Sequence, residues 1–158
     1  MESRSVHLPG YTTAAQRKFR KRALQVIQNL KTRMLKAGFT LDGFNRDALL
    51  EILAAGIGNP CPYCGESIKT RTMSPDHPTP ISKGGDPWVI QVCCQRDNRR
   101  KGEMDDAEYR KLLTHLETYC PETKAYILRM LSAGAAFPMM QRGILSMKAR
   151  LTSAGGQK

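Results

Sequence analysis

The sequence predicts an α+β fold, a mostly helical chain around a small centre framed by cysteines. Three observations predict this class. Apolar residues recur at helical spacing in the first quarter of the chain, one short run near residue 90 is rich in β-branched residues, and two pairs of candidate ligands enclose a proline-rich segment. The 158 residues are enough for one domain of ordinary size.

The first expected element is a long helix over residues 12–37. Its apolar residues recur at steps of three and four, and they are Phe19, Ala23, Val26, Leu30 and Met34. The other positions are strongly basic and include Arg17, Lys18, Arg20, Lys21, Arg22, Lys31, Arg33 and Lys36. Because like charges at this density destabilise a helix, we expect this surface to bind nucleic-acid phosphates. A solvated helix face is the alternative.

The remaining elements alternate between helices and a turn-rich middle. They are, in chain order, a short helix over 46–55 capped by Asn45, a turn-rich segment over 61–85, a strand over 89–94, a helix from about Asn98 that is clearest over 105–117, a helix near 127–131 and a last basic helix over 139–151. In the short helix we expect Leu49, Ile52 and Leu53 to face inward. Residues 1–11 are expected to fray.

The net charge of +11 is unevenly distributed. Residues 61–117 are neutral, with nine basic and nine acidic residues, so the whole surplus lies in the flanks. This division predicts a basic helical region over 1–60, a central motif over 61–117 and a second basic helical region over 118–158. A neutral centre between basic flanks suits a site with its own acidic chemistry, held on a polyanion by its surroundings.

The cysteines point to metal binding. The chain has five cysteines, an odd number, and no export signal precedes them. Free thiols or metal ligands are therefore favoured over disulfides. Cys61 and Cys64 have the spacing of half a tetrahedral zinc site, and Cys94 and Asp97 repeat that spacing with a carboxylate in the last position. Two other cysteines are alternatives for the fourth ligand, Cys93 and Cys120. For all five cysteines, the alternative is a role as small buried apolar residues.

Between these two pairs lies an Asp-His pair, Asp76 and His77, in a segment that prolines hold extended. Neighbouring side chains in an extended segment point to opposite sides. One of the two could therefore face a metal and the other a water molecule.

The order of these elements resembles the HNH endonucleases, members of the ββα-metal nuclease superfamily. The resemblance covers residues 61–108, where CxxC is followed by Asp-His, Gly-Gly, and CxxD-Asn ending in Lys-Gly. The 21-residue step from His77 to Asn98 is similar to that of zinc-bearing phage endonucleases that resolve branched DNA. The resemblance therefore implies a small ββα-metal motif with a structural zinc site at the centre of the fold.

The resemblance also implies residue roles. His77 would be the general base that activates water, and Asp76 with Asn98 would hold the catalytic cation. The chemistry is consistent, since an imidazole accepts a proton near neutral pH and oxygen ligands suit Mg²⁺ or Mn²⁺. The structural zinc ligands would be Cys61, Cys64, Cys94 and Asp97.

Two positions depart from the family pattern. The family's central Asn, which often orients the catalytic His, should fall near Val89, but the sequence has no Asn there. The backbone or Asp86 is the expected substitute. The last zinc cysteine of the family is replaced by Asp97.

The implied function is that of a metal-dependent DNA endonuclease or nickase. The cations after the zinc pair are expected to meet phosphates beside the cleaved one, and they are Arg96, Arg99, Arg100 and Lys101. A non-catalytic zinc-ribbon module that binds nucleic acid is the alternative, and an RNA-directed nuclease is a weaker one. No apolar run approaches the roughly 18 residues of a membrane span. The expected location is the cytoplasm, that of the host if the chain is phage-like and phage-encoded, and a homodimer stays open.

Overall fold

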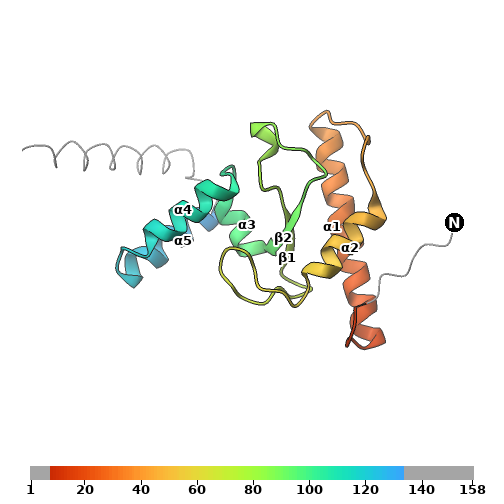
Figure 1. The fold of residues 1–158 in the computed structure, drawn as a ribbon, viewed down its shortest axis with the longest axis horizontal. Coiled ribbons are helices and arrows are strands. Elements are labelled where there is room, and N and C mark those ends of the chain that lie inside the picture. Colours follow the sequence, from red (N-terminus) through yellow and green to blue (C-terminus); the bar gives the residue numbers. More distant parts are fainter. Residues whose placement is uncertain (1–7, 134–158) are drawn as a thin grey trace, which may run out of the picture.

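The computed structural model describes residues 8–133, which form helices around one small antiparallel sheet. Its elements are α1 (Thr13–Lys36), α2 (Arg46–Gly56), β1 (Met73–Asp76), the 3-10 turn η1 (Ile81–Lys83), β2 (Gln91–Cys94), α3 (Gln95–Lys101), α4 (Asp106–Leu116) and α5 (Pro121–Ala133). Figure 1 shows α1 and α2 on one side of the two strands and α3, α4 and α5 on the other. The predicted α+β class is confirmed. The basic helix expected over 139–151 lies outside the described residues.

Helix α1 matches its prediction closely. Thr12 caps it by accepting a hydrogen bond from the Ala15 amide at 3.3 Å, and the last helical residue is Lys36. Its buried stripe contains every residue expected there, and Ile27 as well. One apolar cluster joins this stripe to α2, to Cys61 and to both strands. Leu8 is also part of that cluster, so the expected fraying of residues 1–11 is wrong at this residue, because its apolar side chain is buried.

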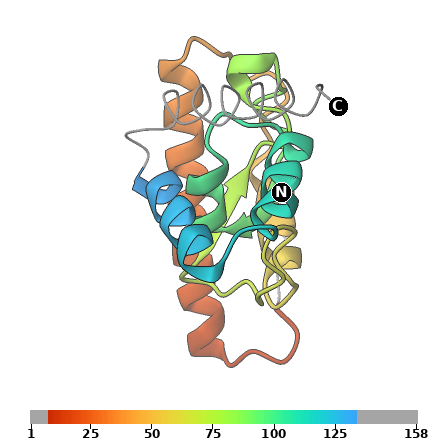
Figure 2. The ribbon, with the colours of Figure 1, turned by 90° about the vertical axis from the view of Figure 1, so that its left-hand side faces the viewer.

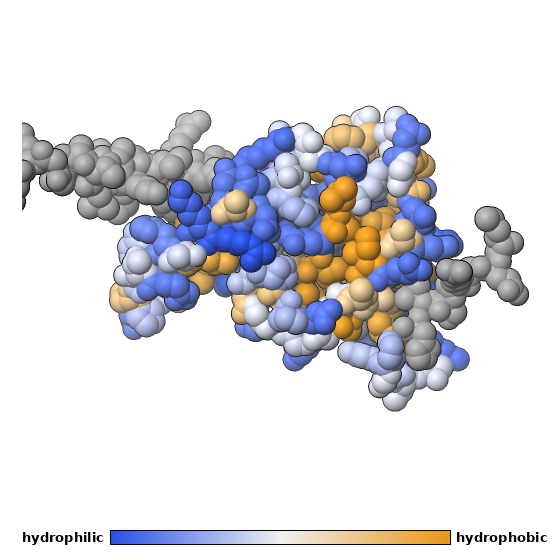
Figure 3. Space-filling model, in the orientation of Figure 1, coloured by the Kyte–Doolittle hydropathy of each residue, from blue (hydrophilic) through white to orange (hydrophobic). Residues whose placement is uncertain are grey.

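Helix α2 begins where predicted, with the Asn45 side chain accepting hydrogen bonds from two backbone amides. The inward face differs by one residue from the expectation. Leu50 is 3% exposed and Ile52 is 37% exposed, because α2 presents Leu49, Leu50 and Leu53 to the core. Figure 3 shows apolar residues gathered over α2 on this side of the molecule, whereas the α3–α5 side is largely hydrophilic.

The sheet brings the two halves of the motif together. Strands β1 and β2 are antiparallel, with Met73 opposite Cys94 and Asp76 opposite Gln91. The strand expected over 89–94 is two residues shorter, because a turn precedes it. The Val89 amide donates to the Asp86 carbonyl at 3.3 Å, which leaves Val89 outside the ladder and 58% exposed.

The helix expected from Asn98 is in fact two helices, α3 and α4. Helix α3 begins earlier, at Gln95, with Cys94 as its N-cap, and it ends at Gly102, whose φ of 54° lies in a region that favours glycine. Asp105 and Glu108 form a capping box that starts α4. Figure 2 shows α5 packed beside α3, where Figure 1 also places it. No helix among residues 8–133 is long and apolar enough to cross a bilayer, and the predicted boundaries at residues 60 and 117 stay predictions.

The close approach of α2 to β2 gives a test of this packing. A Cβ at Gly56 would lie 2.6 Å from the Val92 Cβ. Because the backbone fixes the position of both atoms, no side-chain rotation relieves this contact. We expect Gly56→Ala to lower the free energy of unfolding by about 1–3 kcal/mol, although alanine is the better helix former. Urea unfolding measures it.

The control for this test is the exposed neighbour Ala55, where a serine should change the free energy of unfolding by less than about 0.5 kcal/mol. An unchanged or raised stability of Gly56→Ala would show that α2 does not pack this closely on β2.

Candidate metal centre and nuclease site

Four side chains converge at the end of β2. Cys61 and Cys64 lie in a tight turn that is closed by hydrogen bonds from the Cys61 amide to Glu66 and from the Gly65 amide to Cys61. Cys94 ends β2 and Asp97 lies in the first turn of α3. Their ligand atoms all lie within 4.8 Å of one another. The cluster therefore contains the donors that the sequence predicts for zinc.

The distances fit a tetrahedral ion. The Cys64 and Cys94 sulfurs are 3.9 Å apart, and the Asp97 Oδ2 lies 2.9 Å from the Cys94 sulfur and 3.7 Å from the Cys61 sulfur. A zinc ion with bonds of about 2.3 Å to sulfur requires tetrahedral edges of about 3.8 Å between sulfurs. Three thiols and one carboxylate could thus hold a metal ion with little movement.

The two other cysteines lie outside this cluster. The Cys93 sulfur is buried and directed at the Cys94 carbonyl, 3.5 Å away. Cys120 is exposed between α4 and α5, beside the Thr123 hydroxyl. Among the alternatives for the fourth ligand, the described residues place only Asp97 with the other three.

Hydrogen bonds from the thiols to the Asp97 carboxylate join the members of this cluster. Burial raises the pKa of the Cys64 and Cys94 thiols, and the neighbouring Asp97 carboxylate adds to this. Burial alone would raise the pKa of Asp97, but hydrogen bonds from Cys64, Cys94 and Tyr109 outweigh it and lower that pKa. A metal would therefore displace protons from the thiols, so its affinity should depend on pH.

The second oxygen of Asp97 is oriented by α4. The Tyr109 hydroxyl, which is completely buried, donates to Asp97 Oδ1 at 3.1 Å, and an Arg100 guanidinium nitrogen lies 3.5 Å from the same oxygen. Such outer contacts fix the geometry of a ligand. No pattern in the sequence marks Tyr109 as a partner of this cluster.

The three predicted catalytic residues line one cavity. Asp76 ends β1, His77 follows it, and Asn98 comes from the middle of α3. All three line a cavity of about 260 Å³, together with Arg33 of α1 and Glu103. Segments that are far apart in the sequence thus bring an imidazole, a carboxylate and an amide to one place.

Asn98 presents its oxygen because its nitrogen is fully used. Its Nδ2 donates to the Ser74 hydroxyl at 2.8 Å and to the Pro75 carbonyl at 2.6 Å. Both bonds tie α3 to β1. They leave Oδ1, which has no hydrogen-bond donor among residues 8–133, as a neutral oxygen ligand.

His77 is oriented by the backbone. Its Nε2 lies 3.0 Å from the Pro87 carbonyl. A carbonyl only accepts hydrogen bonds, so this nitrogen carries the proton and Nδ1 is the basic one. Of the two expected substitutes for the family's Asn, the contact is therefore made by the backbone, while Asp86 instead accepts a hydrogen bond from the Trp88 amide.

Asp76 lies in a buried polar network. The Lys101 ammonium, 1% exposed, is 3.0 Å from Asp76 Oδ1 and 2.6 Å from the His77 carbonyl. On the other oxygen, Tyr63 donates at 2.5 Å and Gln91 at 3.0 Å. Both Tyr63 and Gln91 also contact Asp106.

This network was not predicted from the sequence, although one spacing is a signal for it. Lys101 lies three residues after Asn98 and so shares its face of α3. It was expected to bind phosphates, but its buried ammonium faces a carboxylate instead.

The remaining cations have different surroundings. Arg96 pairs with Glu66 at 3.0 Å, and the Arg100 Nε donates to the Ser132 hydroxyl at 3.0 Å. Arg99 is exposed. On α1, six cations are exposed and two, Arg22 and Lys31, are half-buried. The exposed ones are Arg17, Lys18, Arg20, Lys21, Arg33 and Lys36.

The comparisons with known proteins agree with this geometry. A family model described as HNH endonuclease matches residues 61–114. The matched segment contains the cysteine cluster and all three residues of the cavity that were predicted to be catalytic.

Neither the search of curated proteins nor that of solved structures gave a match. The HNH domain indicates nuclease activity, and HNH nucleases act on DNA. Residues 61–114 of this chain are therefore an HNH endonuclease domain.

Proposed function

We propose that this chain is a metal-dependent DNA endonuclease or nickase. His77 is its general base, and Asp76 with Asn98 holds a catalytic Mg²⁺ or Mn²⁺. The observation that carries the proposal is the single cavity that these three side chains share inside the HNH domain.

The chemistry follows from the position of the His77 proton. With Nε2 donating to the Pro87 carbonyl, Nδ1 accepts a proton from a water molecule. The water oxygen then forms a bond to phosphorus, and the bond from phosphorus to the leaving sugar oxygen breaks. The Pro87 contact keeps the ring in place during this transfer.

The cation ligands are two oxygens of different charge. Asp76 Oδ1 supplies a charged ligand and Asn98 Oδ1 a neutral one, a donor set that suits a hard divalent cation. When bound, this cation would stabilise charge on the phosphate and the leaving oxygen. The Lys101 ammonium, 3.0 Å from Asp76 Oδ1, would have to move aside for a cation at this oxygen.

The cysteine cluster has a structural role in this proposal. Zinc held by Cys61, Cys64, Cys94 and Asp97 would fix the cysteine turn to the start of α3, next to Asn98. This arrangement leaves no open position for water, as is usual for a structural zinc site.

The first test is replacement of the base. We expect His77→Ala to lower the rate of DNA cleavage by about 10²-fold or more, while DNA affinity in the absence of added metal stays within about twofold. Nicking of supercoiled DNA and cutting of linear and branched DNA, with Mg²⁺ or Mn²⁺, measure the rate.

The matched control is His115→Ala, because His115 is exposed on α4 and lies outside the cavity. Equal cleavage by the wild-type protein and His77→Ala would end the proposal.

Metal analysis tests the cysteine cluster. We expect about one zinc per chain in the purified protein, and a content well below one for Cys94→Ser, together with a lower melting temperature, because metal binding contributes to folding. Cys120→Ser is the matched control and should keep its zinc. A wild-type protein that contains no zinc would contradict the structural role.

The Lys101–Asp76 pair gives a separate prediction. Lys101→Met leaves a buried carboxylate without its counter-charge, which should lower the free energy of unfolding by about 3–5 kcal/mol. Mg²⁺ or Mn²⁺ should restore part of this loss, because the cation replaces the missing charge. Thermal unfolding with and without the cation measures both effects.

The control for this prediction is Lys111→Met, at an exposed position of α4. A Lys101→Met protein whose stability does not respond to either cation would argue against Asp76 as a metal ligand.

A further inference from the structure

Two grooves flank helix α1, and only one of them is lined by a carboxylate. One groove, of about 880 Å³, lies between α1 and the start of α2. The other, of about 440 Å³, lies between α1 and β1. The basic residues of α1 are therefore divided between two surfaces, although the sequence presents them as one.

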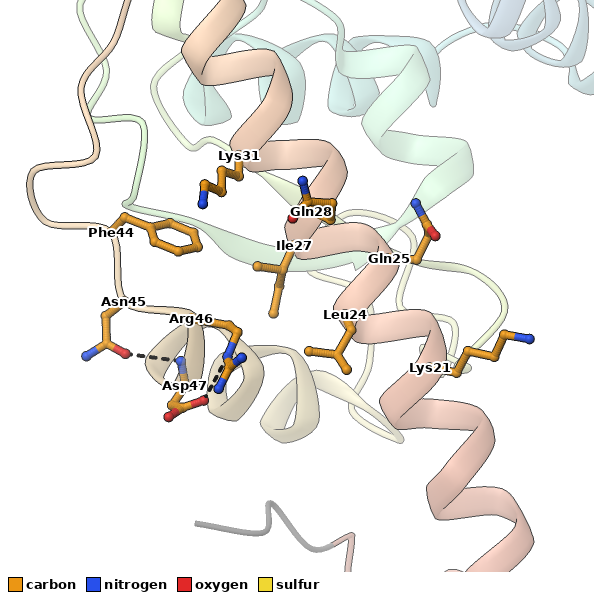
Figure 4. A pocket seen from close by; sticks show the side chains of 10 residues that line it. All are labelled: Lys21, Leu24, Gln25, Ile27, Gln28, Lys31, Phe44, Asn45, Arg46 and Asp47. Carbon is orange, nitrogen blue, oxygen red and sulfur yellow. Dashed lines mark hydrogen bonds and ion pairs between the residues drawn. The ribbon is translucent and has the colours of Figure 1, made fainter. Parts of the chain in front are cut away.

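Two of the three cations of the α1–α2 groove, Arg46 and Lys31, have partners within it. Figure 4 shows Arg46 paired with Asp47 at the start of α2, an ion pair of 3.3 Å. The Lys31 ammonium lies 5.3 Å from the centre of the Phe44 ring. This groove therefore contains a carboxylate and cations that are already partly neutralised.

The α1–β1 groove has a different lining. It contains two guanidinium groups, from Arg22 and Arg33, and no carboxylate. Among residues 8–133, neither guanidinium forms a salt bridge. The neutral hydrogen-bonding residues of the lining are Asn29, Thr32 and Ser74, and its apolar residues are Val26, Met73 and Pro75.

This groove adjoins the His77 cavity. Arg33 and Pro75 line both of them. Arg22, Asn29 and Arg33 are spaced by seven and four residues, so they form one stripe along α1 that ends at the cavity. The stripe spans about 16 Å from residue 22 to residue 33, which is long enough to contact more than one phosphate of a DNA strand.

We infer that the α1–β1 groove guides one strand of duplex DNA into the His77 cavity, with Arg22 and Arg33 on its phosphates. The inference rests on the proposed nuclease function and adds the path of the substrate. Guanidinium groups and neutral donors recognise phosphate oxygens without reading bases. The groove thus positions the strand independently of its sequence, and Arg33 is the positioning residue nearest the reaction.

The test compares two pairs of substitutions on the same helix. Arg22→Ala/Arg33→Ala removes two charges from the α1–β1 groove, and Lys21→Ala/Lys31→Ala removes two from the α1–α2 groove. Both are made in a His77→Ala background without added Mg²⁺ or Mn²⁺. No DNA is cut under these conditions, and no chelator disturbs the cysteine cluster.

Fluorescence anisotropy with a labelled DNA duplex measures affinity over a series of salt concentrations. We expect the arginine pair to weaken binding about tenfold and to reduce the slope of log affinity against log salt by about two. The lysine pair should change affinity less than about threefold and the slope by less than one. Arg22→Lys/Arg33→Lys should recover most of the slope, since the charges remain, and thermal unfolding checks that all variants are folded.

Cleavage assays with His77 present separate the two proposals. If the wild type cuts DNA and the arginine pair binds and cuts equally well, the groove inference is wrong and the nuclease function stands. Equal losses from the two pairs would also overturn it, because charge alone would then explain binding. If the wild type cuts no DNA, the nuclease proposal fails, and with it the role of the groove in guiding a substrate strand.

Discussion

Cys94 is at once the last residue of β2, the N-cap of α3 and a member of the cysteine cluster. Its sulfur lies beside the carboxylate of Asp97. Asn98, which follows Asp97, donates hydrogen bonds to Ser74 and Pro75 of β1. The position of Asn98 opposite His77 therefore depends on how β2 turns into α3. Any shift of this junction would move the amide away from the cavity, because a helix transmits a displacement at its first turn to all its residues.

The buried Asp76 imposes a second constraint. A carboxylate that is 4% exposed requires a counter-charge and hydrogen-bond donors. Lys101 provides the charge, and Tyr63 and Gln91 provide the donors. These groups come from the cysteine turn, β2 and α3, so the network connects the same three elements as the cysteine cluster does. The contacts that stabilise this buried charge therefore also hold the end of β1 in place.

Local signals in the sequence predicted the local structure. The spacing of apolar residues by three and four predicted the position of α1, and Asn45 predicted the start of α2. Both signals depend only on residues that are close in the sequence. The inward turn of Leu50 in place of Ile52 depends on where α1 and β2 lie, which no local pattern contains. Gly102 was present in the sequence as a helix breaker, but its positive φ is evident only in the structure.

The site was predictable to a similar extent. The order and spacing of the motif predicted that Asp76, His77 and Asn98 lie at one site, and all three line one cavity. The orientation of His77 could not be predicted, because its partner is a backbone carbonyl and every residue has one. The burial of Lys101 could not be predicted either. A lysine in a run of four cations is usually solvated, and only the position of Asp76 behind it explains the exception.

The neutrality of residues 61–117 acquires a physical meaning from these contacts. Many of its cations are paired with its own acids, which leaves few charges for a polyanion. The pairs between described residues of this segment are Lys101–Asp76, Arg96–Glu66, Arg96–Asp97, Arg100–Asp97, Lys83–Glu108 and Arg110–Asp106. An HNH domain neutralised in this way has a weak attraction for DNA of its own. The surplus positive charge of the described chain comes instead from α1, which has eight basic and no acidic residues and lies outside the HNH match. Helix α1 meets the cavity at Arg33. The most basic helix and the His77 cavity therefore belong to different parts of the chain, which meet at Arg33 in the wall of that cavity.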